Sequence, residues 1–171
     1  MDIDLDQRGV AYAEATSPSR LAWEGIGGTI LIAANWGPEA ESSAYKPEDA
    51  VLAVKHVVVS AFLDEIVAAC LSLSRRKSSS FSLVVHGTPI ELALEVNHES
   101  AEVKILEYVD YSDRTRTLGT LVISRNDLFQ TVAEVVEKFA KRLASANPAM
   151  EQNSGFLSFT RQAISLRKQV T

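Results

Sequence analysis

Cysteine and long apolar runs are scarce in this chain, and each scarcity excludes a class of protein. Cys70 is the only cysteine among 171 residues, so an internal disulfide framework is excluded and a reducing compartment is expected. No apolar run reaches the roughly 20 residues that a helix needs to span a bilayer. The first residues are acidic and lack the basic stretch that opens a secretory signal. We therefore expect a soluble cytoplasmic protein that has no membrane partner.

Basic side chains are the minority charge. The chain has 17 Lys and Arg against 22 Asp and Glu, which gives a net charge of −5. Nucleic-acid binding rests on neutralising phosphates with Lys and Arg, so this balance argues against a nucleic-acid partner. Residues 141–171 are the exception, with five basic side chains and one acidic one. We interpret that segment as a solvated helix face.

A phosphate-binding loop is missing as well. Gly25, Gly27 and Gly28 are the closest group of glycines, but they precede the apolar strand predicted at 29–34. Dinucleotide and nucleotide loops place their glycines after a strand and before a helix. The Gly-Lys-Ser/Thr ending of a P-loop is absent. We interpret the glycines as a tight turn, a bulge or a strand pair, and we predict no cofactor.

The three histidines do not form a recognisable metal or catalytic pattern. His86 and His98 are predicted at opposite ends of one strand, which separates them by roughly 20 Å. His56 has no neighbouring ligand at helical spacing. Cys70 follows an apolar helical pattern, so an inert buried thiol is expected. We predict no metal site and no catalytic residues.

Two segments show helical periodicity. The first is predicted at 47–74, as one helix or two with a break, because Pro47 suits a helix start and acidic residues follow it. A valine cluster inside this segment also favours a strand. The second is predicted near 126–145, where Ser124 and Asp127 resemble a capping box. The apolar stripe of the first segment is Val51, Val54, Val58, Phe62, Ile66, Ala69 and Leu73.

Between the two helical segments, apolar and polar residues alternate in a way that is typical of an antiparallel meander with one buried face. A four-residue hairpin loop at 97–100 would pair Val96 with Ala101 and Leu94 with Val103. On the opposite face it would place Glu95 across from Glu102, a like-charge pair that Lys104 would partly relieve. Leu92 would pair with Ile105 in the same register.

The end of this meander is rich in acids and tyrosines. Tyrosines within an acidic rim are typical of a surface that binds a basic protein. The alternative is an ordinary solvated sheet end. The predicted partner-binding residues are Glu95, Glu102, Glu107, Tyr108, Asp110, Tyr111 and Asp113.

These patterns predict an α+β fold in a single domain, with a four- or five-stranded, mainly antiparallel sheet and two or three helices on one face. Residues 1–20 are predicted to form a flexible arm, 21–146 the α+β domain, and 147–171 a linker and C-terminal helix.

Three functions are compatible with this fold. We expect a non-catalytic protein that binds or neutralises another protein, as immunity proteins and secretion chaperones do, rather than an enzyme. The alternative is a small enzyme or ligand-binding domain with a pocket between sheet and helices, involving His56 or His86. A third is a structural subunit that oligomerises through a sheet edge or its last helix, since the sequence leaves the oligomeric state open.

Overall fold

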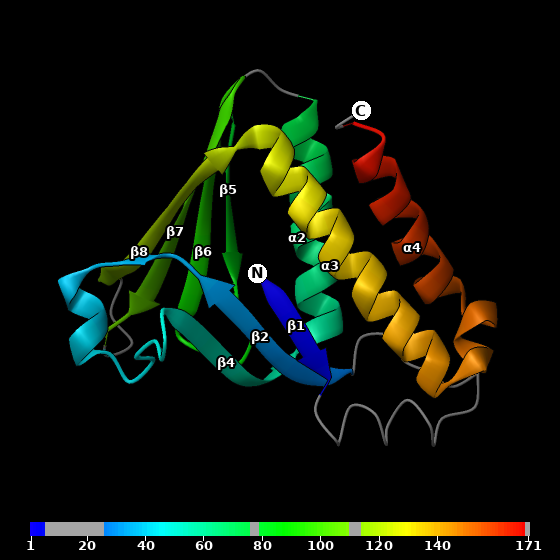
Figure 1. Cartoon of the computed structure of the whole chain (residues 1–171), viewed down its shortest axis with the longest axis horizontal. Helices are drawn as coiled ribbons and strands as arrows, with labels where there is room; N and C mark the ends of the chain where they lie inside the picture. Colours follow the sequence, from blue (N-terminus) through cyan, green and yellow to red (C-terminus); the bar gives the residue numbers. More distant parts are fainter. Residues whose placement is uncertain (6–25, 76–78, 110–113, 170–171) are drawn as a thin grey trace.

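The computed structural model describes residues 1–5, 26–75, 79–109 and 114–169 and confirms an α+β fold. Among the described residues there are two antiparallel sheets. The larger one lies on one side of the molecule and the long helices lie on the other, and the smaller one runs across the lower middle of the view (Figure 1). The three-stranded sheet has the order β1 (Asp2–Leu5), β2 (Gly27–Ala33), β4 (Val51–Val58). The five-stranded sheet has the order β3 (Asn35–Trp36), β8 (Thr115–Ser124), β7 (Ser100–Tyr108), β6 (Ile90–Val96), β5 (Ser79–Val84).

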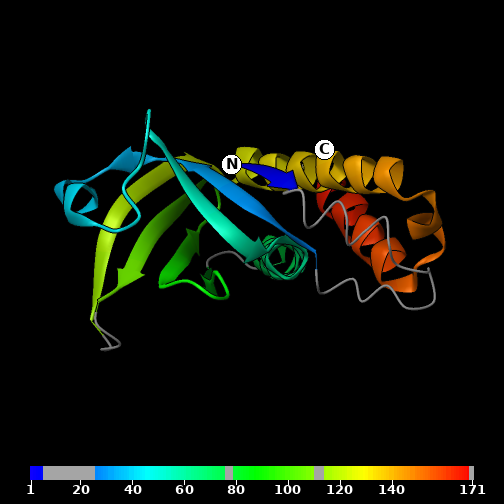
Figure 2. The ribbon, with the colours of Figure 1, turned by 90° about the horizontal axis from the view of Figure 1, so that it is seen from below.

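Within the described residues the helical layer consists of three α-helices. They are α2 (Val59–Ser74), α3 (Arg125–Ala146) and α4 (Ser154–Arg167). Two short 3₁₀ helices, η2 (Pro38–Ser42) and η3 (Pro148–Gln152), connect neighbouring elements. The long helices α3 and α4 lie side by side (Figure 2). The strands β2 and β4 are antiparallel neighbours in the smaller sheet. Among the described residues no helix is both long and apolar enough to cross a membrane.

The meander has the predicted register. Val96 lies opposite Ala101 and Leu94 lies opposite Val103. The loop is closed by Asn97, whose side-chain oxygen accepts hydrogen bonds from the backbone N–H groups of Glu99 and Ser100. This local turn stabilises the four-residue loop and so sets which residues pair across the two strands.

The helix prediction for residues 47–58 is wrong. The second half of the segment forms α2, but Val51–Val58 forms β4, which pairs with β2. Pro47 precedes a tight turn rather than a helix, and in that turn Asp49 and Ala50 adopt positive φ angles of 49° and 63°. The spacing of the valines fits a helical stripe as well as a strand, and pairing with β2 makes this segment a strand.

This strand and β1 create the second sheet, which the sequence pattern did not predict. Residues 2–5 form β1, although they fall in the segment expected to be a flexible arm. Residues 6–20 of that arm lie outside the described residues. Lys138 on α3 contacts the Asp2 carboxylate at 2.7 Å and so connects β1 to the helical layer. The proposed division of the chain into arm, domain and C-terminal segment stays a prediction.

A bulge interrupts the pairing of β2 with β4 next to Gly28, which is one of the three arrangements that the glycine pattern left open. Gly28 pairs with Val57 and Ile30 pairs with Val54, so β4 holds one extra residue. His56 lies within this bulge and has a φ of 60°. A bulge bends the strand locally and increases its twist. Gly25 lies outside the described residues.

The core lies between the five-stranded sheet, β2 and the helices. It includes the inward residues of the meander and the apolar stripes of α2 and α3. The helix α3 begins as predicted, since the Ser124 side chain accepts a hydrogen bond from the Asp127 N–H at 3.0 Å. It ends at Ala146, close to the expected end of the helix, and Asn147 is its C-cap residue. Phe139 on α3 meets Phe159 on α4 edge to face, with ring centroids 6.4 Å apart.

Candidate partner-binding face

The five-stranded sheet has one face that the described helices cover and one face that they do not cover. Side chains alternate along each strand, so Leu92 and Leu94 on β6 point toward the helices while Glu91 and Glu95 point the other way. We call the side that carries Glu91 and Glu95 the outer face. The described helices lie on the opposite side of the sheet (Figures 1 and 2).

One row of side chains crosses four strands of the outer face at its hairpin end. Ser80 on β5 pairs with Glu95, Glu95 pairs with Glu102, and Glu102 pairs with Val122 on β8. The predicted like-charge pair is therefore present. Lys104 lies between its members, 3.8 Å from Glu95 and 3.5 Å from Glu102, as expected.

This row lines a groove of about 670 Å³, together with residues of the hairpin loop. Val122 is 63% exposed at one end of the row, which is unusual for a large apolar side chain in the middle of a strand. An exposed apolar side chain beside two carboxylates combines the apolar contact and the charge that protein-binding surfaces use.

A second cluster lies further along the outer face. Glu91 is only 8% exposed, and its two carboxylate oxygens accept hydrogen bonds from the hydroxyls of Ser82 on β5 and Tyr108 on β7. Among the described residues, no Lys, Arg or His side chain approaches Glu91 within salt-bridge distance. Burial of a carboxylate without a cation is unfavourable, so this cluster presents negative charge that a cationic group could offset.

The predicted site residues divide into three groups. Glu95, Glu102 and Tyr108 lie on the outer face, with Tyr108 half-buried. Glu107 does not, because its side chain points to the inner face. Asp110, Tyr111 and Asp113 lie outside the described residues, so their role stays a prediction.

Glu107 is 5% exposed and forms part of a buried polar network instead of the expected acidic rim. Arg116 on β8 holds its carboxylate at 2.6 Å, and the Ser43 hydroxyl donates to the same oxygen at 2.9 Å. The network connects the segment after η2 to the end of the sheet. The period-two pattern could have revealed this, since Glu107 has the same parity as the buried Val103 and Ile105.

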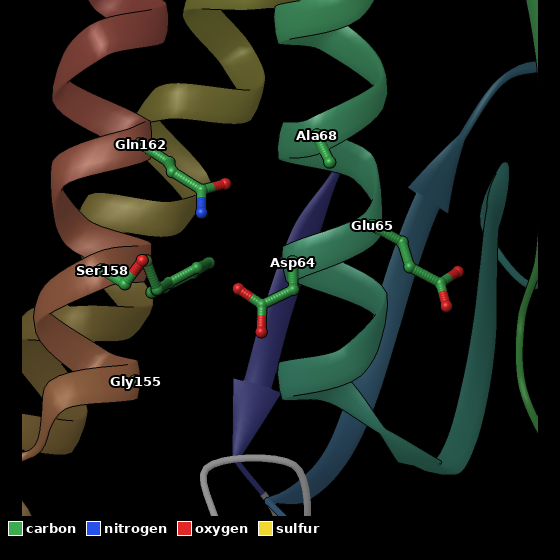
Figure 3. A pocket seen from close by; sticks show the side chains of 7 residues that line it. Asp64, Glu65, Ala68, Gly155, Ser158 and Gln162 are labelled. Carbon is green, nitrogen blue, oxygen red and sulfur yellow. The ribbon is translucent and has the colours of Figure 1, made fainter.

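A second hollow, which the sequence did not predict, lies between α2 and α4. It has a volume of about 430 Å³. Asp64 on α2 and Gln162 on α4 point into the gap, and Ser158 and Gly155 border it, whereas Glu65 points away from α4 (Figure 3). The gap offers a carboxylate and an amide over a partly apolar wall.

The space between the sheet and the helices contains a smaller and more apolar cavity than the hollow between α2 and α4. This cavity has a volume of only about 50 Å³ and is lined almost entirely by apolar side chains from β2, α2, β6, β7, β8 and α3. Ligand pockets commonly have volumes of about 300–1,000 Å³. This cavity is therefore too small for an organic ligand.

The histidines lie in separate parts of the fold. His56 is in β4, and His98 is exposed in the hairpin loop. His86 follows β5, and its Nε2 lies 2.9 Å from a carboxylate oxygen of Glu65 on α2. Within the described parts of the chain, no three His, Cys, Asp or Glu side chains group together in a way that could hold a metal ion.

Cys70 is buried in α2, as the sequence predicted. Burial raises the pKa of the Cys70 thiol to about 12, because a thiolate would lose its hydration there. The thiol is therefore protonated at neutral pH and is a poor nucleophile.

No family model, curated protein or solved structure matches this chain.

Proposed function

We propose that this protein binds a basic protein partner through the outer face of its five-stranded sheet, as a neutralising or chaperone-like protein does. The observation that carries the proposal is the row in which the exposed Val122 lies beside Glu102 and Glu95 along a groove. Exposed apolar surface supplies affinity on burial, while the carboxylates favour a positively charged partner.

The buried Glu91 carboxylate strengthens this proposal. A Lys or Arg side chain of the partner would offset the Glu91 charge, and the ring of the half-buried Tyr108 lies next to it. On this face Glu91, Glu95 and Glu102 outnumber the single Lys104. A nucleic acid would be repelled by the same charges, so a nucleic-acid partner is not part of the proposal. We place the interaction in the cytoplasm because the lone cysteine suits a reducing compartment.

The test is partner capture with a charge-reversed face. The whole chain serves as bait in three forms: the natural protein, the double variant Glu95→Lys/Glu102→Lys, and a control double variant Glu134→Lys/Glu151→Lys. The control makes the same change in net charge at exposed positions on α3 and η3. Captured proteins are identified by mass spectrometry, and association rates are then measured with the purified partner at low and high salt.

We expect the natural protein and the control to capture the same basic partner. Association of the Glu95→Lys/Glu102→Lys variant should be slower by about tenfold or more at low salt, with a smaller difference at high salt because salt screens exposed charges. Equal association rates for both double variants at low salt would show that the outer face does not bind the partner.

A second candidate function is binding of a small polar ligand between α2 and α4. The observation in its favour is the hollow of about 430 Å³, which falls in the size range of ligand pockets. Asp64 would favour an amine or other cationic group. A thermal-shift screen of cationic metabolites, repeated with Asp64→Asn and Gln162→Ala, tests this function separately from the outer face, because neither residue lies on the sheet.

A further inference from the structure

The two sheets have four edge strands among the described elements. They are β1 and β4 in the three-stranded sheet, and β3 and β5 in the five-stranded sheet. The free backbone groups of an edge strand can pair with another chain. Proteins prevent this pairing with charged side chains, bulges, prolines or very short edge strands.

Three of these edges carry such protection. The strand β1 carries the charged side chain of Asp2, which is partly exposed. The strand β4 exposes Lys55 and contains the bulge at His56. The strand β3 is only two residues long. Unwanted pairing is therefore opposed at each of these edges.

The fourth edge, β5, carries none of these features. Its sequence is Ser-Ser-Phe-Ser-Leu-Val, without charge, proline or glycine, and it pairs with β6 in an uninterrupted register. Phe81 and Val84 are 36% and 41% exposed. Helix α2 packs against β5, where Leu83 is buried, but Ser80, Ser82 and Val84 are all exposed. Among the described strands only β6 pairs with β5, so the side of β5 away from β6 has no strand partner.

The hydrogen-bond pattern shows which residues face the free edge. The Val85 N–H donates to the Ile90 carbonyl at 2.8 Å, so Val85 directs its backbone groups toward β6. In an antiparallel pair this direction alternates from residue to residue. Ser80, Ser82 and Val84 therefore direct their N–H and C=O groups away from β6, toward the open edge.

We propose that two copies of this chain pair through β5 in antiparallel orientation, about a two-fold axis at Ser82. Ser82 then lies opposite Ser82 of the second copy, and Ser80 lies opposite Val84. This register uses all three outward-facing residues of each copy, and it brings no charged residues of β5 together. The two five-stranded sheets become one continuous sheet.

The proposal does not depend on the proposed function, and the solution mass tests it directly. Light scattering after size-exclusion chromatography should give twice the 18.6 kDa mass of the chain. Ser82→Pro should give a monomer, because it removes an outward-facing N–H while leaving the hydrogen bonds to β6 in place. The matched control Ser82→Ala keeps this N–H and, like the proline variant, loses the hydroxyl bond to Glu91, so it should remain a dimer.

Circular dichroism of Ser82→Pro should match that of the natural protein, so that loss of the dimer is separated from loss of the fold. A natural protein that has the mass of a monomer at the highest concentration measured would overturn the proposal. A Ser82→Pro variant that folds and remains a dimer would overturn it as well.

A cross-linking experiment tests the register. Residues opposite each other in a hydrogen-bonded antiparallel pair have Cα atoms about 5.5 Å apart, within the range of about 4.4–6.8 Å that a disulfide bridges. Ser82→Cys should therefore form a disulfide-linked dimer on mild oxidation, while the native Cys70 is buried and does not compete. Thr117→Cys, exposed on β8, is the control and should stay unlinked. Linking of the control but not of Ser82→Cys would place the dimer contact on another surface and overturn the proposal.

Discussion

Replacing Leu94 by alanine should destabilise the protein by about 4 kcal/mol. Leu94 is 1% exposed and lies opposite Val103, beside the small apolar cavity under the sheet. The change removes three buried carbons, worth about 0.8 kcal/mol each in transfer free energy. If about 60 Å³ of new void remains, about 24 cal/mol per Å³ adds roughly 1.4 kcal/mol. Strands β5 and β7 flank Leu94, so little collapse of the void is expected.

Urea denaturation followed by circular dichroism measures this change as a lower midpoint at an unchanged slope. The control is Val122→Ala on the outer face, where the side chain is largely exposed. We expect the control to cost less than about 0.5 kcal/mol. A cost below about 0.5 kcal/mol for Leu94→Ala as well would mean that the face carrying Leu94 is not the packed one.

Three further predictions test other parts of the structure. Gly119→Ala should cost about 1–3 kcal/mol in urea denaturation, because its new Cβ would lie 2.7 Å from the Trp36 ring. Gly37→Ala, whose nearest contact would be 3.7 Å, should cost far less, and equal costs would contradict the Trp36 packing. The native Cys70 thiol should resist an aqueous thiol reagent at pH 8 and react only after denaturation, because burial raises its pKa to about 12; rapid labelling of the native protein would show that it is accessible. The hydrogen bond from the α3 lysine lowers the pKa of the Asp2 carboxyl below its ordinary value of 3.8. This pair therefore stabilises the fold above pH 3.8, and the stabilisation is lost as the pH falls through the lower folded-state pKa. Asp2→Asn should remove it. The pair is exposed, so the effect on the acid limb of the stability curve should be below about 1 kcal/mol, and an unchanged acid limb would mean that the pair contributes nothing.

The meander was predictable because its signals are local. Alternation with period two assigns each residue to a face, and the four-residue loop at Asn97 sets the register. The pairing of Glu95 with Glu102 follows directly from that register. The start of α3 was predictable for the same reason, since the Ser124 cap acts within one turn of the helix.

The strand β4 was not predictable, because its valines fit a helical stripe as well as a strand. Pairing with β2, roughly 25 residues earlier in the chain, decides between the two. The period-two pattern places Glu107 on the inner face, but the partners that bind its carboxylate there, Arg116 and Ser43, come from two other segments. Only contacts between distant parts of the chain supply the partners that make a buried carboxylate favourable.

Local patterns in the sequence were enough to predict the α+β class, the antiparallel meander with its register, and the placement of Glu95 and Glu102 on one sheet face. Each of these follows from side-chain alternation, loop length or composition, which act over a few residues. Contacts between distant segments, in contrast, create the second sheet, place the described helices on one face of the five-stranded sheet, and leave β5 at its edge. Strand order and helix placement depend on which distant surfaces bury the most apolar area together, and no local pattern contains that information.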